Sequence, residues 1–86
     1  MYVVELSFDD NPDRLAHRPA HREKLREQRE QGVVVMAGPW GDDTGALLIV
    51  DIDDAEELER LLEDDPYYRA PGVTIVSKRQ WAPVIR

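Results

Sequence analysis

The chain has 86 residues, no cysteine and a formal net charge of −7, from 18 acidic and 11 basic residues. Its size predicts a single domain over 1–86, and its acidic balance argues against binding a nucleic-acid backbone or an anionic membrane surface. Disulfides and cysteine zinc sites are excluded, so oligomerisation is the remaining common way to stabilise so small a core. Neither a membrane span nor a signal peptide is recognisable, and we expect a cytoplasmic protein.

The first half of the chain predicts a strand, a helix and a second strand. Residues 2–8 alternate between apolar and polar positions, which is typical of a strand with one covered face. Pro19 fits the first turn of a helix, so we place a regular helix at about 19–31, after a turn or short helix. Gly32 should end that helix, because glycine readily adopts the conformation that follows a helix. The apolar run 33–37 predicts the next strand.

The second half repeats this order. A turn-rich connection leads to a strand at 44–51. Asp53 or Asp54 is then placed to cap a helix with an apolar stripe, and Asp65-Pro66 should end it. The last strand is expected at 73–81.

The order β-α-β-β-α-β predicts a ferredoxin-like α+β fold, an antiparallel sheet with both helices on one face. One covered face should give alternating strands, but the segments 33–37 and 46–50 are apolar at every position. The economical explanation is a second copy of the sheet, so we predict a homodimer through the face opposite the helices. The alternative is a hydrophobic strand with a partly exposed face.

The first helix carries a candidate acid–base residue, His21. Leu25 is the only large apolar residue of this helix, and His21 lies one turn before it on the same stripe, facing the sheet. A buried imidazole needs a partner, because leaving it unpaired costs roughly 1–3 kcal/mol. Histidine is a natural acid–base group near neutral pH. The alternative role is structural, with the ring bonded to a carbonyl in the core.

A metal site at this helix is not expected. His17 precedes His21 by four residues, a spacing that can hold zinc. Pro19 interrupts the helical register between them, however, and no third ligand is evident. His17 is expected to be exposed.

Two other short motifs have simple structural interpretations. Asp65-Pro66-Tyr67 is typical of the end of a helix, and Gly38-Pro39-Trp40 of a turn after a strand. No phosphate-binding loop, dinucleotide-binding glycine pattern or nucleophile elbow is present.

Taken together, these motifs resemble the YciI-like (YCII-related) family over residues 2–83. The resemblance rests on their order and spacing: Arg18-Pro19-Ala20-His21, Gly32, Ala37-Gly38-Pro39, Asp43, Gly45, Asp65-Pro66-Tyr67 and Trp81-Ala82-Pro83. It implies a ferredoxin-like domain of the dimeric α/β-barrel superfamily, which dimerises through its sheet.

The resemblance also implies an active site. By motif match its histidine and aspartate are His21 and Asp65, while Arg18 and the Gly38-Pro39 segment lie near the pocket. One member type is linked to dehydrochlorination of a hydroxylated aromatic, and related superfamilies include muconolactone isomerases and small monooxygenases. This chain departs from the family in the charged Arg22 and Glu23 that follow the histidine, which bears on the polarity of the pocket.

Two functions are therefore considered. The first is a cofactor-independent lyase or isomerase acting on a small cyclic or aromatic molecule. His21 would move a proton and Asp65 would orient its ring, while Arg18 would hold a carboxylate or phenolate. Trp40, Tyr67 and Tyr68 would line an apolar pocket, although aromatic residues at such places more often serve packing.

The second is a non-catalytic small-molecule-binding or accessory dimeric module, in which the same dyad ties the first helix to residues 65–68. A dyad at a cavity wall favours chemistry, and a dyad sealed from every cavity favours structure.

Overall fold

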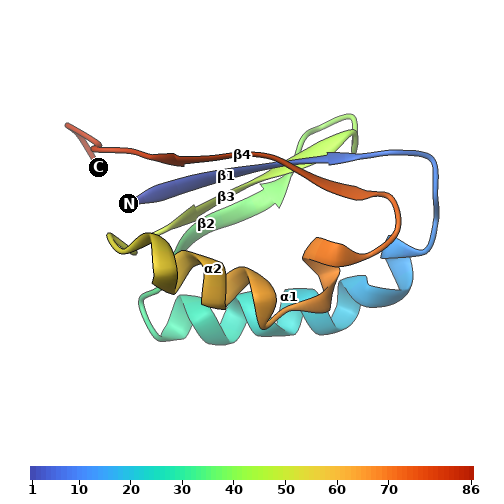
Figure 1. Ribbon diagram of the computed structural model, residues 1–86, viewed down its shortest axis with the longest axis horizontal. Helices are drawn as coiled ribbons and strands as arrows, with labels where there is room; N and C mark the ends of the chain where they lie inside the picture. Colours follow the sequence, from blue (N-terminus) through green and yellow to red (C-terminus); the bar gives the residue numbers. More distant parts are fainter.

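The computed structural model describes residues 1–86 and has the predicted ferredoxin-like α+β architecture. In chain order, the elements are β1 (Tyr2–Phe8), α1 (Arg14–Glu30), β2 (Val34–Pro39), β3 (Gly45–Val50), α2 (Ala55–Glu63), the short 3₁₀ helix η1 (Pro66–Arg69) and β4 (Val73–Gln80). The strands form one sheet in the order β2-β3-β1-β4, and every neighbouring pair is antiparallel. Both helices lie on the same side of this sheet (Figure 1).

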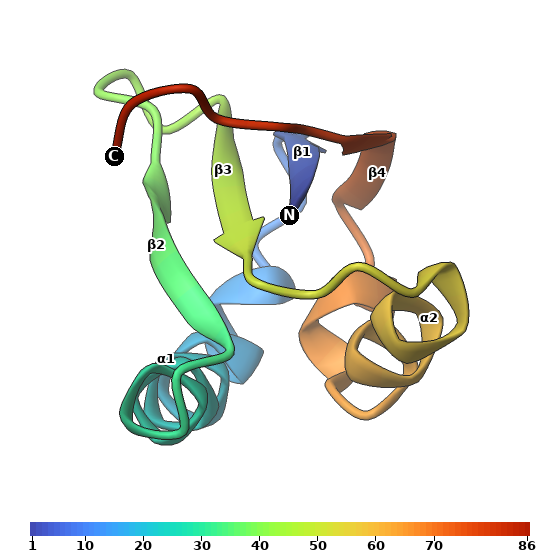
Figure 2. The same cartoon turned by 90° about the vertical axis from the view of Figure 1, so that its left-hand side faces the viewer.

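The core lies between the sheet and the two helices. The alternation of β1 places Val4 and Leu6 in this core, opposite Leu48 and Ala46 of β3. From the other side α2 contributes a buried stripe that includes Leu58. Seen along the sheet, α1 lies below β2 and α2 lies towards the β4 side (Figure 2). The two helices therefore leave room between them for the segment that carries η1.

The start of α1 differs from the sequence prediction. The helix is continuous from Arg14, and Pro19 lies inside it instead of in its first turn. Proline has no backbone N–H, so the carbonyl of Leu15 receives no helical hydrogen bond from position 19. Both Leu15 and Pro19 are exposed, so water can replace the missing donor. The interior proline is tolerated because it lies near the solvated beginning of the helix.

The end of α1 is as predicted. Gly32 has φ of +79°, a conformation that suits glycine. Its N–H donates to the Arg29 carbonyl at 3.0 Å, and the N–H of Val33 donates to the Gln28 carbonyl at 2.9 Å. These two bonds form a Schellman motif, which satisfies carbonyls at the helix end and turns the chain into β2.

The remaining boundaries agree closely with the predictions. Asp54 caps α2, and its carboxylate accepts the N–H of Glu56 at 3.0 Å. The strand β2 continues to Pro39, two residues past its predicted end at 37. A proline is tolerated there because β2 is an edge strand and needs no donor on its outer side.

The outer face of the sheet carries apolar side chains. Met36 lies opposite Ile49, which lies opposite Val3, and all three point away from the helices. Met36 is 67% exposed in the single chain. The segment after β4 crosses one end of the sheet (Figure 2) and leaves Ile85 almost fully exposed. Neither α1 nor α2 combines the length and the hydropathy that a membrane-spanning helix requires.

Candidate active site

A histidine–aspartate pair joins α1 to the segment after α2. His21 Nδ1 lies 2.6 Å from Asp65 Oδ2, and the two side chains are only 11% and 7% exposed. The second carboxylate oxygen, Oδ1, accepts the backbone N–H of Tyr67 at 3.0 Å and caps η1. Asp65 is therefore fixed by the turn that follows it, and it fixes the imidazole in turn.

Two tyrosines of η1 surround the imidazole. The ring of Tyr67 stacks on His21 with centroids 4.0 Å apart and planes 5° apart, and Tyr68 meets it edge-on at 5.2 Å. Burial, followed by the nearby charge of Asp65, raises the pKa of the Tyr68 phenol. Tyr68 therefore stays neutral beside the dyad at physiological pH.

The other ring nitrogen of His21 has no partner in the protein. Nε2 makes no hydrogen bond, and it is not among the polar atoms sealed from solvent without one. Because Asp65 accepts from Nδ1–H, the hydrogen-bond network assigns the lone pair of the neutral ring to Nε2. The free nitrogen is thus open to a proton from outside the protein.

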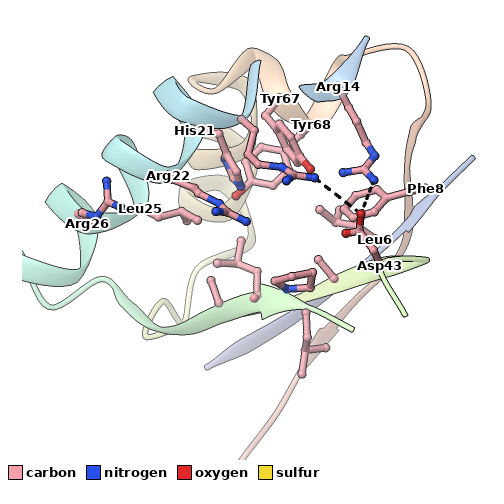
Figure 3. A pocket seen from close by; sticks show the side chains of 17 residues that line it. Leu6, Phe8, Arg14, His21, Arg22, Leu25, Arg26, Asp43, Tyr67 and Tyr68 are labelled. Carbon is pink, nitrogen blue, oxygen red and sulfur yellow. Dashed lines mark hydrogen bonds and ion pairs between the residues drawn. The ribbon is translucent and has the colours of Figure 1, made fainter. Parts of the chain in front are cut away.

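The imidazole lines a cavity of about 270 Å³ between α1, the sheet and η1. Figure 3 shows the side chains that surround this space. Its walls are formed by Leu6, Phe8, Arg14, Arg18, His21, Arg22, Leu25, Arg26, Ala37, Gly38, Pro39, Asp43, Ala46, Leu47, Leu48, Tyr67 and Tyr68. Apolar side chains make one part of the wall, and the arginines of α1 make another.

One end of the cavity holds a cluster of three charges. Arg14 Nη2 donates to Asp43 Oδ2 at 2.9 Å (Figure 3). Arg18 Nη2 lies 3.7 Å from the same oxygen. The Arg14 guanidinium also packs over the ring of Phe8 at 4.1 Å. Burial alone lowers the pKa of Arg14, but Asp43 and Tyr67 outweigh it and raise the pKa overall. Arg14 is therefore a permanent cation in this wall.

The β2–β3 loop brings Asp43 to this position. The N–H of Asp43 donates to the Trp40 carbonyl and that of Trp40 to the Gly45 carbonyl, both at 2.9 Å. Asp43 itself has φ of 58°, which aspartate tolerates better than most residues. Next to it, hydrogen bonds from Thr44 lower the pKa of the Asp42 carboxyl. This closed turn directs the Asp43 carboxylate towards α1.

The residues singled out from the sequence are placed as follows. His21 and Asp65 meet, and Arg18, Gly38, Pro39 and Tyr67 line the cavity beside them. Trp40, which was expected to line the pocket, is not among the residues that line this cavity. Its ring covers Gly45, where it closes the β2–β3 hairpin.

His17 is exposed on α1, as expected, and no group of three or more metal-ligand side chains converges in the chain.

Sequence reasoning missed Arg14 as part of the site. Because the predicted helix began at residue 19, Arg14 lay outside it and could not be assigned to a face of the helix. In the continuous helix, Arg14 precedes Arg18 by one turn and therefore shares its side. The four-residue spacing of Arg14, Arg18, Arg22 and Arg26 was the available signal.

The fold and the dyad define a ferredoxin-like domain with a histidine–aspartate pair whose histidine lines a cavity. The family profile of the YCII-related domain matches residues 1–82. The chain therefore belongs to the YCII-related family. A comparison with curated proteins finds no matching sequence.

A solved structure has the same fold. It is the 5-chloro-2-hydroxyhydroquinone dehydrochlorinase from Burkholderia phenoliruptrix, in complex with 2,5-dihydroxybenzoquinone. The match has a TM-score of 0.60 and 17% sequence identity, and it covers 95% of this chain and 94% of the other. At this identity the likeness shows the fold alone.

Proposed function

We propose that this protein is a cofactor-independent acid–base enzyme with a lyase or isomerase reaction on a small cyclic or aromatic molecule. The observation that carries the proposal is the free Nε2 of His21, at the wall of a cavity of about 270 Å³, with Nδ1 held by Asp65. A dyad sealed from every cavity would favour a structural role. This one lies at the wall of a cavity, which favours chemistry over the accessory-module alternative.

The arrangement suits a proton shuttle. Neutral His21 would take a proton from the bound molecule at Nε2, while Asp65 holds the Nδ1–H and stabilises the imidazolium that forms. The same nitrogen would return the proton to a leaving group or to another ring carbon. The stacked Tyr67 keeps the imidazole plane fixed during both transfers.

The volume and the apolar walls of the cavity support a substrate with a single ring. The cavity volume of about 270 Å³ is near the lower end of the usual range for ligand pockets. Apolar walls such as Leu6, Phe8 and Leu48 suit the faces of a ring. The dehydrochlorinase of similar fold is named for an oxygenated ring compound and was solved with another. We therefore propose an oxygenated ring as the substrate class.

Turnover of a small panel of candidate substrates tests this function. Chlorinated hydroxyhydroquinones and unsaturated lactones are incubated with the protein, and chloride release and ring absorbance are followed. His21→Ala should lower kcat by about 10²–10⁴-fold, the usual contribution of a general acid–base group. The matched control is His17→Ala, an exposed histidine on the same helix, which should keep the wild-type rate. Wild-type turnover in His21→Ala would contradict the proposal.

We also propose that the working unit is a homodimer joined through the outer face of the sheet. The apolar row of Val3, Met36 and Ile49 on that face supports it, as does the exposed Ile85 near its end. A single 86-residue chain without disulfides gains most from such an additional interface.

A further inference from the structure

A buried guanidinium nitrogen at the cavity has no partner. Arg14 is 7% exposed, and its Nη1 is the only buried side-chain nitrogen or oxygen without a hydrogen bond. The neighbouring Nη2 is already taken by Asp43, and the Tyr67 hydroxyl, which raises the pKa of the same guanidinium, forms no hydrogen bond of good geometry with Nη1. An unmet donor on a buried cation is costly, and proteins nearly always satisfy such atoms. The lining position of Arg14 leaves the cavity as the place from which a partner would come.

The charge around the cavity is unbalanced in the same direction. Four arginines of α1 line it, whereas Asp43 is its only lining carboxylate. Arg22 has no ion pair, and Arg26 pairs with Glu23 on its own helix. The whole chain carries −7, so this positive wall runs against the average charge of the molecule. A cavity of this kind concentrates anions.

We propose that the site takes a ring compound bearing an anionic oxygen, which binds to Arg14 Nη1 together with Arg18. Carboxylate and phenolate oxygens share this chemistry. Asp43 is then a positioning residue, which holds both guanidinium groups at the end of the cavity. The inference rests on the proposed function in one respect, because it takes the His21 cavity to be the substrate site.

The relative positions suit such a ligand. In Figure 3 the guanidinium of Arg14 and the imidazole of His21 lie on opposite sides of the Tyr67 and Tyr68 rings. A ring bound in the cavity beside these tyrosines would present its anionic oxygen to the arginines and a more distant atom to His21. The arginines would thus select the substrate by charge, and the dyad would act on another part of it.

The first test compares charged and neutral probes on the unmodified protein. Benzoate and benzamide have nearly the same shape, and their binding is measured by NMR titration of the His21 and Tyr67 ring signals. Benzoate should bind at least about tenfold more tightly, because charge-assisted hydrogen bonds are the stronger kind. Equal affinity, or no benzoate binding, would overturn the inference. A parallel titration with 4-nitrophenolate and nitrobenzene distinguishes a phenolate preference from a carboxylate one.

Variants test which arginines produce the preference for benzoate over benzamide. Arg14→Gln and Arg18→Gln should each lose most of the tenfold preference for benzoate, and Arg14→Lys should keep part of it. Arg60→Gln, on α2 and away from this cavity, is the matched control and should keep all of it. Since Arg14 is buried, each variant is first checked for folding by far-UV circular dichroism. If Arg14→Gln does not fold, Arg18→Gln and Arg14→Lys carry the test.

The outcomes separate this inference from the proposed enzyme. Arginine-dependent benzoate binding, with turnover unaffected by His21→Ala, would sustain the anion site and contradict the acid–base role. Turnover that depends on His21, with benzoate and benzamide bound equally, would support the acid–base role and contradict the anion site. Full preference for benzoate in both Arg14→Gln and Arg18→Gln would overturn the assignment of these residues.

Discussion

At the residue scale, Asp65 uses its two carboxylate oxygens for different partners. One caps η1 and the other holds His21. Asp65→Ala removes both interactions and should lower the free energy of unfolding by about 2–3 kcal/mol. Asp65→Asn keeps an oxygen for the cap and should lose about 1 kcal/mol. Urea denaturation at neutral pH measures both, and equal losses would show that the cap adds nothing to stability.

Tyr68 predicts a change of stability at alkaline pH. Burial, and then the charge of Asp65, raises the pKa of this phenol above its usual value of about 10. Below that pH both folded and unfolded chains keep the proton. Above it the unfolded chain loses the proton first, so the free energy of unfolding should fall by about 1.4 kcal/mol per pH unit.

Tyr68→Phe is the matched variant for this effect. The Tyr68 hydroxyl has no hydrogen-bond partner in the protein, so we expect little loss of stability at neutral pH. Urea denaturation between pH 7 and 11 should show a shallower alkaline decline in Tyr68→Phe than in the wild type. Identical declines would show that Tyr68 titrates normally in the folded protein.

The site residues differ in how far their positions and partners could be predicted from the sequence. His21 was placed inward because Leu25 is the only large apolar residue of the helix predicted at 19–31, and both residues are mostly or partly buried on one stripe. Its partner depends on a contact 44 residues away, which spacing alone does not provide. The motif resemblance supplied that pairing. Arg14 was missed because its role depends on the helix continuing through Pro19.

At the element scale, the β2–β3 hairpin depends on a glycine. A Cβ on Gly45 would lie 2.1 Å from the Leu6 carbonyl oxygen and 3.1 Å from the Trp40 ring. Gly45→Ala must therefore push β3 away from β1, and we expect a loss of about 2–3 kcal/mol. Thermal and urea denaturation both measure this loss.

Gly38 provides the control for that prediction. It lies in β2 opposite Leu47, and a Cβ there would meet nothing within 4 Å. Gly38→Ala should leave stability unchanged within about 0.5 kcal/mol. A similar loss in both variants would indicate a general effect of alanine in this sheet instead of the close approach at Gly45.

The elements themselves were largely predictable, and their ends less so. Alternation in β1 and the Gly32 cap are local signals, and the structure has both. The start of α1 was not predictable in the same way. A proline is most often tolerated in the first turn of a helix, and only the exposure of Leu15 and Pro19 explains why this one lies further in.

At the scale of the whole molecule, the cavity and the outer face lie on opposite sides of one sheet. The inner side carries the helices, the dyad and the positive wall, while the outer side carries Val3, Met36 and Ile49. This division matches the apolar residues on both faces of β2 and β3. A partner on the outer face would leave the route to the His21 cavity on the helix side.

The homodimer is tested by placing a charge on the outer face. Met36 is 67% exposed in the single chain, so Met36→Lys should change the stability of an isolated chain by less than about 0.5 kcal/mol. In the proposed dimer the same lysine would be buried against its symmetry mate. The variant should therefore weaken association by about 2 kcal/mol or more, roughly a 30-fold rise in the dissociation constant.

Sedimentation equilibrium over a range of protein concentrations measures that constant. Leu15→Lys is the matched control, because Leu15 is 46% exposed but lies on α1, on the helix side of the sheet. It should leave association unchanged. A wild-type chain that sediments as a monomer at every concentration would contradict the homodimer, and an unaltered dimer in Met36→Lys would move the interface away from this face. Lysine is preferred to glutamate here because the chain is already acidic, and added negative charge would weaken association without any local contact.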